Sequence, residues 1–180
     1  GLASAIAAVV REGDEVIIFT PAYDSYAPVV ELHGGVPVFI RLKHPTYHID
    51  WEEVKRMITR KTRLIIINSP QNPTGTVLAQ TDLDQLAHLV ANSNILVLSD
   101  EVYEHITFEG KPHASVIAHP KLADRSLVVF SFGKTFHATG WKLGYVLAPA
   151  NLMAEFRKVH QYDVFSCNTP IQYALADYMQ

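Results

Sequence analysis

Short runs of apolar, often branched residues recur along the chain, and turn-forming residues bound each run. Such runs are typical of buried β-strands, and the stretches between them show the three- and four-residue apolar spacing of helices. The predicted strands are Glu15 to Thr20, Val36 to Leu42, Arg63 to Asn68, Asn94 to Ser99, Ser126 to Ser131 and Leu143 to Ala148. The predicted helices are Ser25 to Leu32, Trp51 to Ile58, Asp82 to Ala91 and Leu152 to Gln161. This alternation predicts an α/β fold with a mostly parallel sheet sandwiched by helices.

Both ends of the chain also have helical patterns. Residues Gly1 to Val10 form an apolar segment with no methionine, signal peptide or cap before it. Residues Pro170 to Gln180 likewise resemble a helix that is cut in mid-course. We therefore expect the 180 residues to be a fragment, one partial domain of a longer protein.

Composition narrows the class of protein. The 15 basic and 18 acidic residues give a net charge of -3 without any run of like charge, so neither nucleic acid nor a membrane surface is an expected partner. Cys167 is the single cysteine and cannot form an internal disulfide, and the apolar runs are too short to span a bilayer. A soluble protein of a reducing compartment, the cytoplasm, is expected.

Three motifs that would indicate other functions fail on inspection. Gly133 to Thr135 imitates the end of a P-loop, but the glycine required five residues before Gly133 is Val128 here. A Gly-x-Gly-x-x-Gly motif is missing. Pro45 separates His44 from His48, and the histidines show no metal-ligand spacing, so no metal site is expected.

Polar residues follow four of the predicted strands. In open α/β sheets, ligands bind beyond the carboxyl ends of the strands. The segments at those ends are Pro21 to Asp24, Asn68 to Gly75, Asp100 to Tyr103 and Ser131 to Lys134. An aromatic ring, an amide, an acid with a phenol, and a lysine with a serine are therefore expected at one rim.

Lys134 and Asp100 are the candidates with the clearest chemistry. A lysine at a strand end in an apolar setting is partly desolvated, which frees its amine to attack carbonyls and form a Schiff base. An ordinary surface lysine is the alternative. Asp100 would place a carboxylate at the mouth of a buried strand, where it needs a cationic or donor partner such as a protonated pyridine nitrogen. A helix N-cap is the alternative for Asp100.

Five further side chains could hold a ligand at this rim. Tyr103 and Asn72 can donate hydrogen bonds to a phenolate oxygen, and Tyr23 offers a flat face for stacking. Ser131 and Lys142 offer a hydroxyl and a cation for a phosphate. Each has an ordinary alternative: packing for the tyrosines, a turn for Asn72, and surface chemistry for the other two.

The segment from Ser131 to Gly144, SFGKTFHATGWKLG, resembles the lysine signature of class I aminotransferases of the pyridoxal-phosphate (PLP) fold type I superfamily. The likeness runs from Gly1 to Gln180. The segments most similar to the kynurenine, glutamine and methionine aminotransferase branch are Pro21 to Tyr26, Asn68 to Gly75, Ser99 to His105 and Val159 to Gln161. Two positions depart from the pattern: Lys142 replaces the usual phosphate-binding arginine, and His137 replaces a small residue. Lysine still neutralises a phosphate, although without the planar fork of arginine.

This resemblance implies a fold, a cofactor and a set of roles. Residues 1–180 would be part of the large, cofactor-binding domain, without the N-terminal segment and the C-terminal small domain. Lys134 would bind pyridoxal 5'-phosphate covalently and shuttle the substrate proton, while Asp100 would pair with the pyridine nitrogen. The remaining cofactor contacts would come from Tyr23, Asn72, Tyr103, Ser131 and Lys142.

The resemblance also implies the reaction and the partners. The expected function is transfer of an amino group from an L-amino acid, such as methionine, an aromatic residue, kynurenine or glutamine, to a 2-oxo acid. Asn72 would line the substrate pocket, and Phe165 and Ser166 would reach into the pocket of the neighbouring subunit of a homodimer. Core packing between two helices is the alternative for Phe165. A cysteine-conjugate β-lyase on the same scaffold and a non-catalytic PLP-binding regulatory module are the alternatives.

Overall fold

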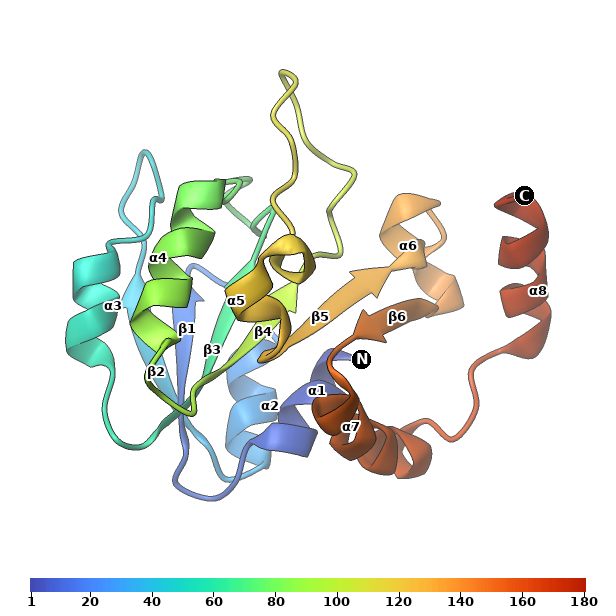
Figure 1. Cartoon of the computed structure of the whole chain (residues 1–180). Helices are drawn as coiled ribbons and strands as arrows, with labels where there is room; N and C mark the ends of the chain where they lie inside the picture. The colour runs from blue at the N-terminus through green and yellow to red at the C-terminus, as the bar shows by residue number, and fades with distance from the viewer.

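Six strands form one sheet in the computed structural model, which describes all residues from Gly1 to Gln180 (Figure 1). They are β1 (Glu15–Thr20), β2 (Val36–Arg41), β3 (Thr62–Asn68), β4 (Leu96–Asp100), β5 (Ser126–Ser131) and β6 (Gly144–Leu147). The order is β2-β1-β3-β4-β5-β6; the first five strands are parallel, and β6 is antiparallel to β5. All six predicted strands are confirmed, and their ends agree to within two residues.

Helices connect the strands and cover the sheet. They are α1 (Leu2–Val9), α2 (Tyr26–Leu32), α3 (Trp51–Met57), α4 (Gln80–Val90), α5 (Pro120–Ala123), α6 (Phe132–Thr135), α7 (Ala150–Asp163) and α8 (Thr169–Tyr178). Two 3₁₀ turns, η1 (Val116–Ala118) and η2 (Thr139–Trp141), complete the structure. The six longer helices match the predicted helical segments. The short elements α5, α6, η1 and η2 contain three or four residues each, too few to show an apolar period.

Two helices show why the chain folds locally as it does. Asp50 caps α3, because its carboxylate accepts the backbone N–H groups of Glu52 and Glu53, both at 3.1 Å. The acidic side chains in the first turn of α3 also stabilise the helix, because they interact favourably with the positive end of the helix dipole. Asn168 caps α8 in the same way, by accepting the N–H of Ile171 at 3.2 Å.

The sheet separates two hydrophobic cores. Successive residues of the central strands point to opposite faces, so that Ile17 and Ile65 join one core and Ile18 and Ile66 join the other. Helices α3, α4 and α5 contribute to the first core, whereas α1, α2 and α7 contribute to the second (Figure 1). Because both faces are covered, the central strands are near-continuous apolar runs, as parallel sheets require. The predicted α/β sandwich is confirmed.

Two segments extend beyond this layered body. The connection between β4 and η1 projects past the carboxyl ends of the strands, and α8 stands beyond β6 (Figure 1). At the β5–β6 pair, a Cβ on Gly144 would lie 2.3 Å from the carbonyl oxygen of Phe130, so only glycine fits there. None of the helices is long and apolar enough to cross a membrane.

Candidate active site

A pocket of about 210 Å³ lies at the carboxyl ends of the central strands. Its lining comes from segments that are far apart in the sequence: Leu2, Tyr23, Asn68, Asn72, Asp100, Val102, Tyr103, Ser131, Lys134, Thr139 and Lys142. All seven side chains predicted to contact a cofactor are among them. The parallel strands explain this convergence, because their carboxyl ends meet at the same edge of the sheet.

Asp100 ends β4 and is only 3% exposed. Its Oδ2 accepts the hydroxyl of Tyr26 at 2.5 Å, and its Oδ1 accepts the N–H of Val102 at 3.3 Å. Burial raises the pKa of Asp100, while these two hydrogen bonds and the charge of Lys134 oppose the rise. No helix begins at Asp100, so the alternative interpretation as a helix N-cap is wrong.

Tyr26 is a site residue that was not predicted from the sequence. It is 3% exposed, and its ring packs edge-to-face against Tyr23 with the centroids 5.6 Å apart. Burial, followed by the charge of Asp100, raises the pKa of Tyr26 far above its usual value, so the hydroxyl stays a proton donor. Its position in the first turn of α2, three residues after Tyr23, was the available signal.

Asn68 is the second residue that was missed, and it fixes the position of Asn72. Asn68 lies opposite Asp100 in the β3–β4 register. Its amide nitrogen donates to the carbonyl oxygen of Asp100 at 2.8 Å, and its amide oxygen accepts the N–H of Asn72 at 2.7 Å. The side chain of Asn72 in turn donates to the hydroxyl of Tyr103 at 3.5 Å. The amide and phenol predicted to act together are therefore adjacent.

Lys134 lies in α6, the short helix that directly follows β5. It is half-buried, and its Nζ lies over the ring of Tyr103, 5.5 Å from the centroid. Its neighbour Gly133 allows the backbone at Thr139 to pack close to α6, because a Cβ on residue 133 would lie only 3.0 Å from the Cα of Thr139. The side chain forms no salt bridge within the chain. Its amine is thus available to a ligand.

Ser131 and Lys142 occupy another part of the lining, together with Leu2 from the first turn of α1. Helix N-termini attract anions, as does the cationic Lys142. Lys142 has the left-handed backbone conformation, with φ of 55°, and His137 has φ of 54°. Non-glycine residues in this conformation cost about 1–3 kcal/mol each and are often held at functional sites. The loop after Lys134 therefore carries strain that its surroundings must compensate.

Glu101 anchors the loop that carries Tyr103. It is 1% exposed and accepts hydrogen bonds from the hydroxyl of Ser99 and the N–H of Val116, both at 2.9 Å. The Nε2 of His113 lies 2.7 Å from its other oxygen. The carboxylate thus ties β4 to the far end of the loop, which fixes both ends of the segment that presents Tyr103.

Phe165 and Ser166 do not line the pocket of their own chain. They lie in the connection between α7 and α8, where Phe165 is 85% exposed. Phe165 therefore does not pack in a core within this chain, which was the alternative to a role at a substrate pocket. A role for either residue requires contact with a second chain or with other segments.

The pocket combines an amine, a buried carboxylate and hydrogen-bond donors at the carboxyl ends of parallel strands. This is the usual position of the ligand in open α/β enzymes, and a lysine there suits covalent chemistry with a carbonyl group. No group of three or more histidine, cysteine, aspartate and glutamate side chains is arranged to hold a metal ion. The fold and the site define an α/β protein with a lysine in its pocket that is available for covalent chemistry with a carbonyl group.

Comparison with known proteins identifies the family. A family model described as "Aminotransferase class I and II" matches residues 1–180, and the chain belongs to this family. Methionine aminotransferase of Escherichia coli (strain K12) is 53% identical over 179 residues, which cover 99% of this chain and 46% of that protein. Kynurenine–oxoglutarate transaminase 1 of Rattus norvegicus is 39% identical, over 94% of this chain and 43% of that protein. The chain thus spans about half the length of these relatives.

Solved structures agree with this assignment. A crystal structure of a methionine aminotransferase from Escherichia coli superposes with a TM-score of 0.96 at 54% identity, covering 98% of this chain and 47% of that chain. N-succinyldiaminopimelate aminotransferase from Mycobacterium tuberculosis gives 0.93 at 38% identity, over 97% of this chain and 46% of that chain. The predicted fold class, that of fold type I aminotransferases, is confirmed.

The residues of the pocket fit pyridoxal 5'-phosphate, the cofactor on which this family depends. The carboxylate of Asp100 is buried, yet it accepts only two hydrogen bonds of the roughly four that its oxygens can take. It can therefore accept a further bond from a protonated ring nitrogen in the pocket. Lys134 would supply an amine for the aldehyde, and Lys142 would supply a charge for the phosphate.

Proposed function

We propose that the protein is an aminotransferase that moves an amino group from an L-amino acid to a 2-oxo acid with the aid of pyridoxal 5'-phosphate. One observation carries the proposal: the free amine of Lys134 and the buried carboxylate of Asp100 line the same pocket. Family membership and relatives named methionine and kynurenine transaminases support it.

Lys134 and Asp100 would perform the central chemistry. The bound cofactor supplies a carbonyl that captures amino groups and a ring that accepts electrons. Lys134 would hold this carbonyl in the resting enzyme and, once freed by the substrate, would move the proton from the substrate Cα to the carbonyl-derived carbon of the cofactor. Asp100 would keep a proton on the ring nitrogen, and a positive charge there would make the ring a better electron acceptor.

The other pocket residues would orient the ring. Ser131 and Lys142 would bind the phosphate, and Tyr23 would pack against the face of the ring. Asn72 and Tyr103, which contact each other at 3.5 Å, would both donate hydrogen bonds to the phenolic oxygen. Orientation of this kind contributes to catalysis because it fixes which substrate bond faces Lys134.

Reductive trapping tests the proposal directly. Borohydride treatment of the full-length holoenzyme should fix the cofactor on Lys134, and peptide mass spectrometry should locate it there. Lys134→Ala is the matched control, which should bind cofactor without becoming labelled. Label on another lysine, or none, would refute the assignment. Assay of the same enzyme with a cysteine conjugate, with pyruvate as the product, measures any β-lyase activity.

We further propose that the preferred donors carry sizeable apolar or sulfur-containing side chains. The segment from Tyr162 to Pro170 contains no basic residue, so it offers no partner for a second substrate carboxylate. Burying such a carboxylate unpaired is costly. A panel of donors against one 2-oxo acid tests this by kcat/KM, with Phe165→Ala as the paired variant. Aspartate reacting faster than methionine and phenylalanine would overturn the preference, and an unchanged profile in the variant would remove Phe165 from the substrate pocket.

A cytoplasmic homodimer is the proposed working form. Large apolar side chains of the C-terminal region are exposed in the single chain: Tyr162, Val164, Phe165, Tyr173, Tyr178 and Met179. Their burial in a second subunit would bring Phe165 and Ser166 toward the partner's pocket. Light scattering of the full-length protein at several concentrations tests the dimer, and cell fractionation tests the compartment. A monomer at all concentrations would contradict the proposal.

A further inference from the structure

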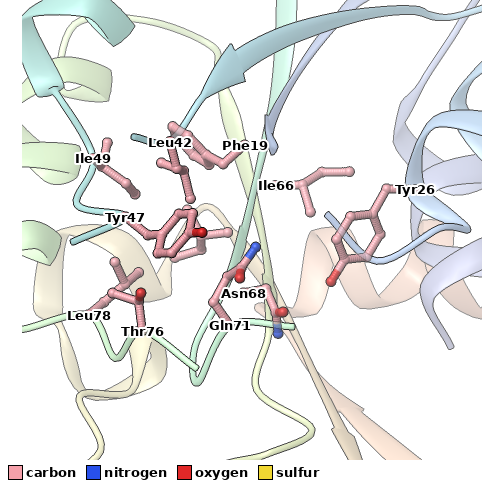
Figure 2. A pocket seen from close by; sticks show the side chains of 11 residues that line it. Phe19, Tyr26, Leu42, Tyr47, Ile49, Ile66, Asn68, Gln71, Thr76 and Leu78 are labelled. Atoms are coloured by element: carbon pink, nitrogen blue, oxygen red, sulfur yellow. The ribbon is translucent and has the colours of Figure 1, made fainter. Parts of the chain in front are cut away.

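Tyr26 connects two residues of the pocket without lining the pocket itself. Its hydroxyl donates to Oδ2 of Asp100 at 2.5 Å, and its ring meets Tyr23 edge-to-face at an interplanar angle of 79°. Figure 2 shows Tyr26 across Asn68 from Tyr47, with its hydroxyl directed away from Ile66. One buried side chain thus touches both the acid and the aromatic ring of the proposed cofactor site.

The hydroxyl of Tyr26 forms a hydrogen bond with Asp100 alone. It makes no other hydrogen bond, and the ring already fills its place in the core beside Val30 and Ile66. A phenylalanine would preserve this packing and the contact with Tyr23, so packing does not explain the hydroxyl. A buried carboxylate is costly unless donors stabilise it. Asp100 accepts two hydrogen bonds, and the one from the phenol of Tyr26 is the shorter, at 2.5 Å against 3.3 Å for the bond from the N–H of Val102.

We propose that Tyr26 is a positioning residue, whose hydroxyl fixes the carboxylate of Asp100 toward the pocket in its charged form while its ring sets the orientation of Tyr23. This inference rests on the proposed function insofar as Asp100 pairs with the cofactor ring. Tyr26 acts through these two neighbours and contacts neither substrate nor cofactor.

The groups around Asp100 determine how loss of the Tyr26 hydroxyl changes the pKa of this carboxyl group. Burial is the largest influence and raises the pKa of Asp100, and the charge of Glu101 raises it further. The hydrogen bonds from Tyr26 and Val102 and the charge of Lys134 lower it. Removing the hydroxyl deletes one lowering influence, so the pKa of Asp100 rises further. A more basic carboxylate takes the proton from a ring nitrogen instead of leaving it there.

The apoprotein provides a test that does not depend on the cofactor. In Tyr26→Phe, the proton affinity of Asp100 should increase about 10- to 100-fold, the range for a hydrogen bond to a charged group. Carbon-13 NMR of aspartate-labelled full-length apoprotein measures this titration, and Asp100→Asn identifies the signal by its loss. Tyr47→Phe, a change at a tyrosine that does not line the pocket, is the matched control and should leave the titration unchanged. An unchanged titration in Tyr26→Phe would overturn the proposal.

The holoenzyme provides the second test. With the cofactor labelled by nitrogen-15 in its ring, Tyr26→Phe should shift the resonance toward unprotonated pyridine. The cofactor dissociation constant should rise about tenfold in the wild-type background and change little in Asp100→Asn, because the hydroxyl acts through Asp100. Equal effects in both backgrounds would mean a merely structural role. If the wild-type protein binds no cofactor, the proposed function fails, while the apoprotein titration still decides the role of Tyr26.

Discussion

Two hollows lie on either side of Asn68, and they differ in size and in how their polar groups are bonded. The pocket described above has about 210 Å³. The other hollow has about 20 Å³, enough for about one water molecule, and is shown in Figure 2. It is lined mostly by apolar residues, with eight hydrophobic side chains among its eleven: Phe19, Tyr26, Leu42, Tyr47, Ile49, Ile66, Ile67, Asn68, Gln71, Thr76 and Leu78.

Gln71 and Thr76, two polar side chains around the small cavity, are already paired. Gln71 donates to the carbonyl of Pro21 at 2.6 Å and accepts from the hydroxyl of Thr74 at 2.5 Å. That hydroxyl also lies 3.1 Å from the hydroxyl of Thr76. In the large pocket, by contrast, Lys134 and Lys142 form no salt bridge. Polar residues at strand ends therefore fall into two kinds, those that complete the fold and those left free for a ligand.

Loss of the free amine in the large pocket should have the largest effect. Lys134→Ala should reduce transamination by about 10³- to 10⁴-fold or more, because general acid–base catalysis alone contributes about 10²- to 10⁴-fold and the covalent bond is lost as well. Steady-state assays with a methionine donor measure this. Cofactor binding should persist in the variant, and cofactor fluorescence is the measurement for it. Full activity of the variant would contradict the assignment of Lys134 as the proton shuttle.

Two substitutions of the buried acid should differ from each other. Asp100→Asn should reduce kcat by about 10²- to 10³-fold, because an amide cannot keep a proton on the ring nitrogen. Asp100→Glu keeps the charge and should reduce kcat far less, although its extra methylene strains the packing. Comparison of kcat for the two variants is the measurement. Equal losses would assign Asp100 to packing.

The second free amine should affect binding more than turnover. Lys142→Ala should raise the dissociation constant of the phosphate-bearing cofactor about 10- to 100-fold, the range for a hydrogen bond to a charged group. Titration of the apoprotein measures this, and pyridoxal without its phosphate is the matched control ligand. Equal weakening of both ligands would show that Lys142 does not bind the phosphate.

A change in the small cavity should have the smallest effect. Thr76→Val keeps the shape and removes a hydroxyl whose partner, Thr74, retains its bond to Gln71. We expect stability to fall by about 1 kcal/mol or less, with cofactor affinity unchanged. Denaturant unfolding and cofactor titration measure the two quantities. A large loss of cofactor affinity would show that the small cavity belongs to the active site.

The sequence predicted features that depend on local pattern. The buried strands and Lys134 were found because apolar runs and the segment around Gly133 are contiguous in the chain. The role of Asn68 was not found, because it depends on the register that places this residue opposite Asp100. The hydroxyl of Tyr26 was missed for the same reason, since its partner lies 74 positions away.

The apolar pattern of the sequence also could not predict that β6 is antiparallel to β5. Apolar alternation is the same in parallel and antiparallel strands, and the connection through α6 and η2 is long enough for either. The surroundings of Phe165 are a different case, because its 85% exposure in the single chain leaves its contacts to another subunit or segment. Contacts with another subunit would be a property of an assembly, which the apolar pattern of one chain does not reveal.

The sequence distance between the pocket residues has a consequence for folding. Leu2 and Lys142 line one pocket although most of the chain lies between them, and the residues between contribute all five parallel strands. Non-local pairing of this kind is slow to form, so the pocket arises late, when the central sheet is complete. A cofactor that binds only the complete pocket stabilises the native state by mass action. Cofactor supply would therefore affect how much of the newly made chain keeps its native fold once the pocket has formed.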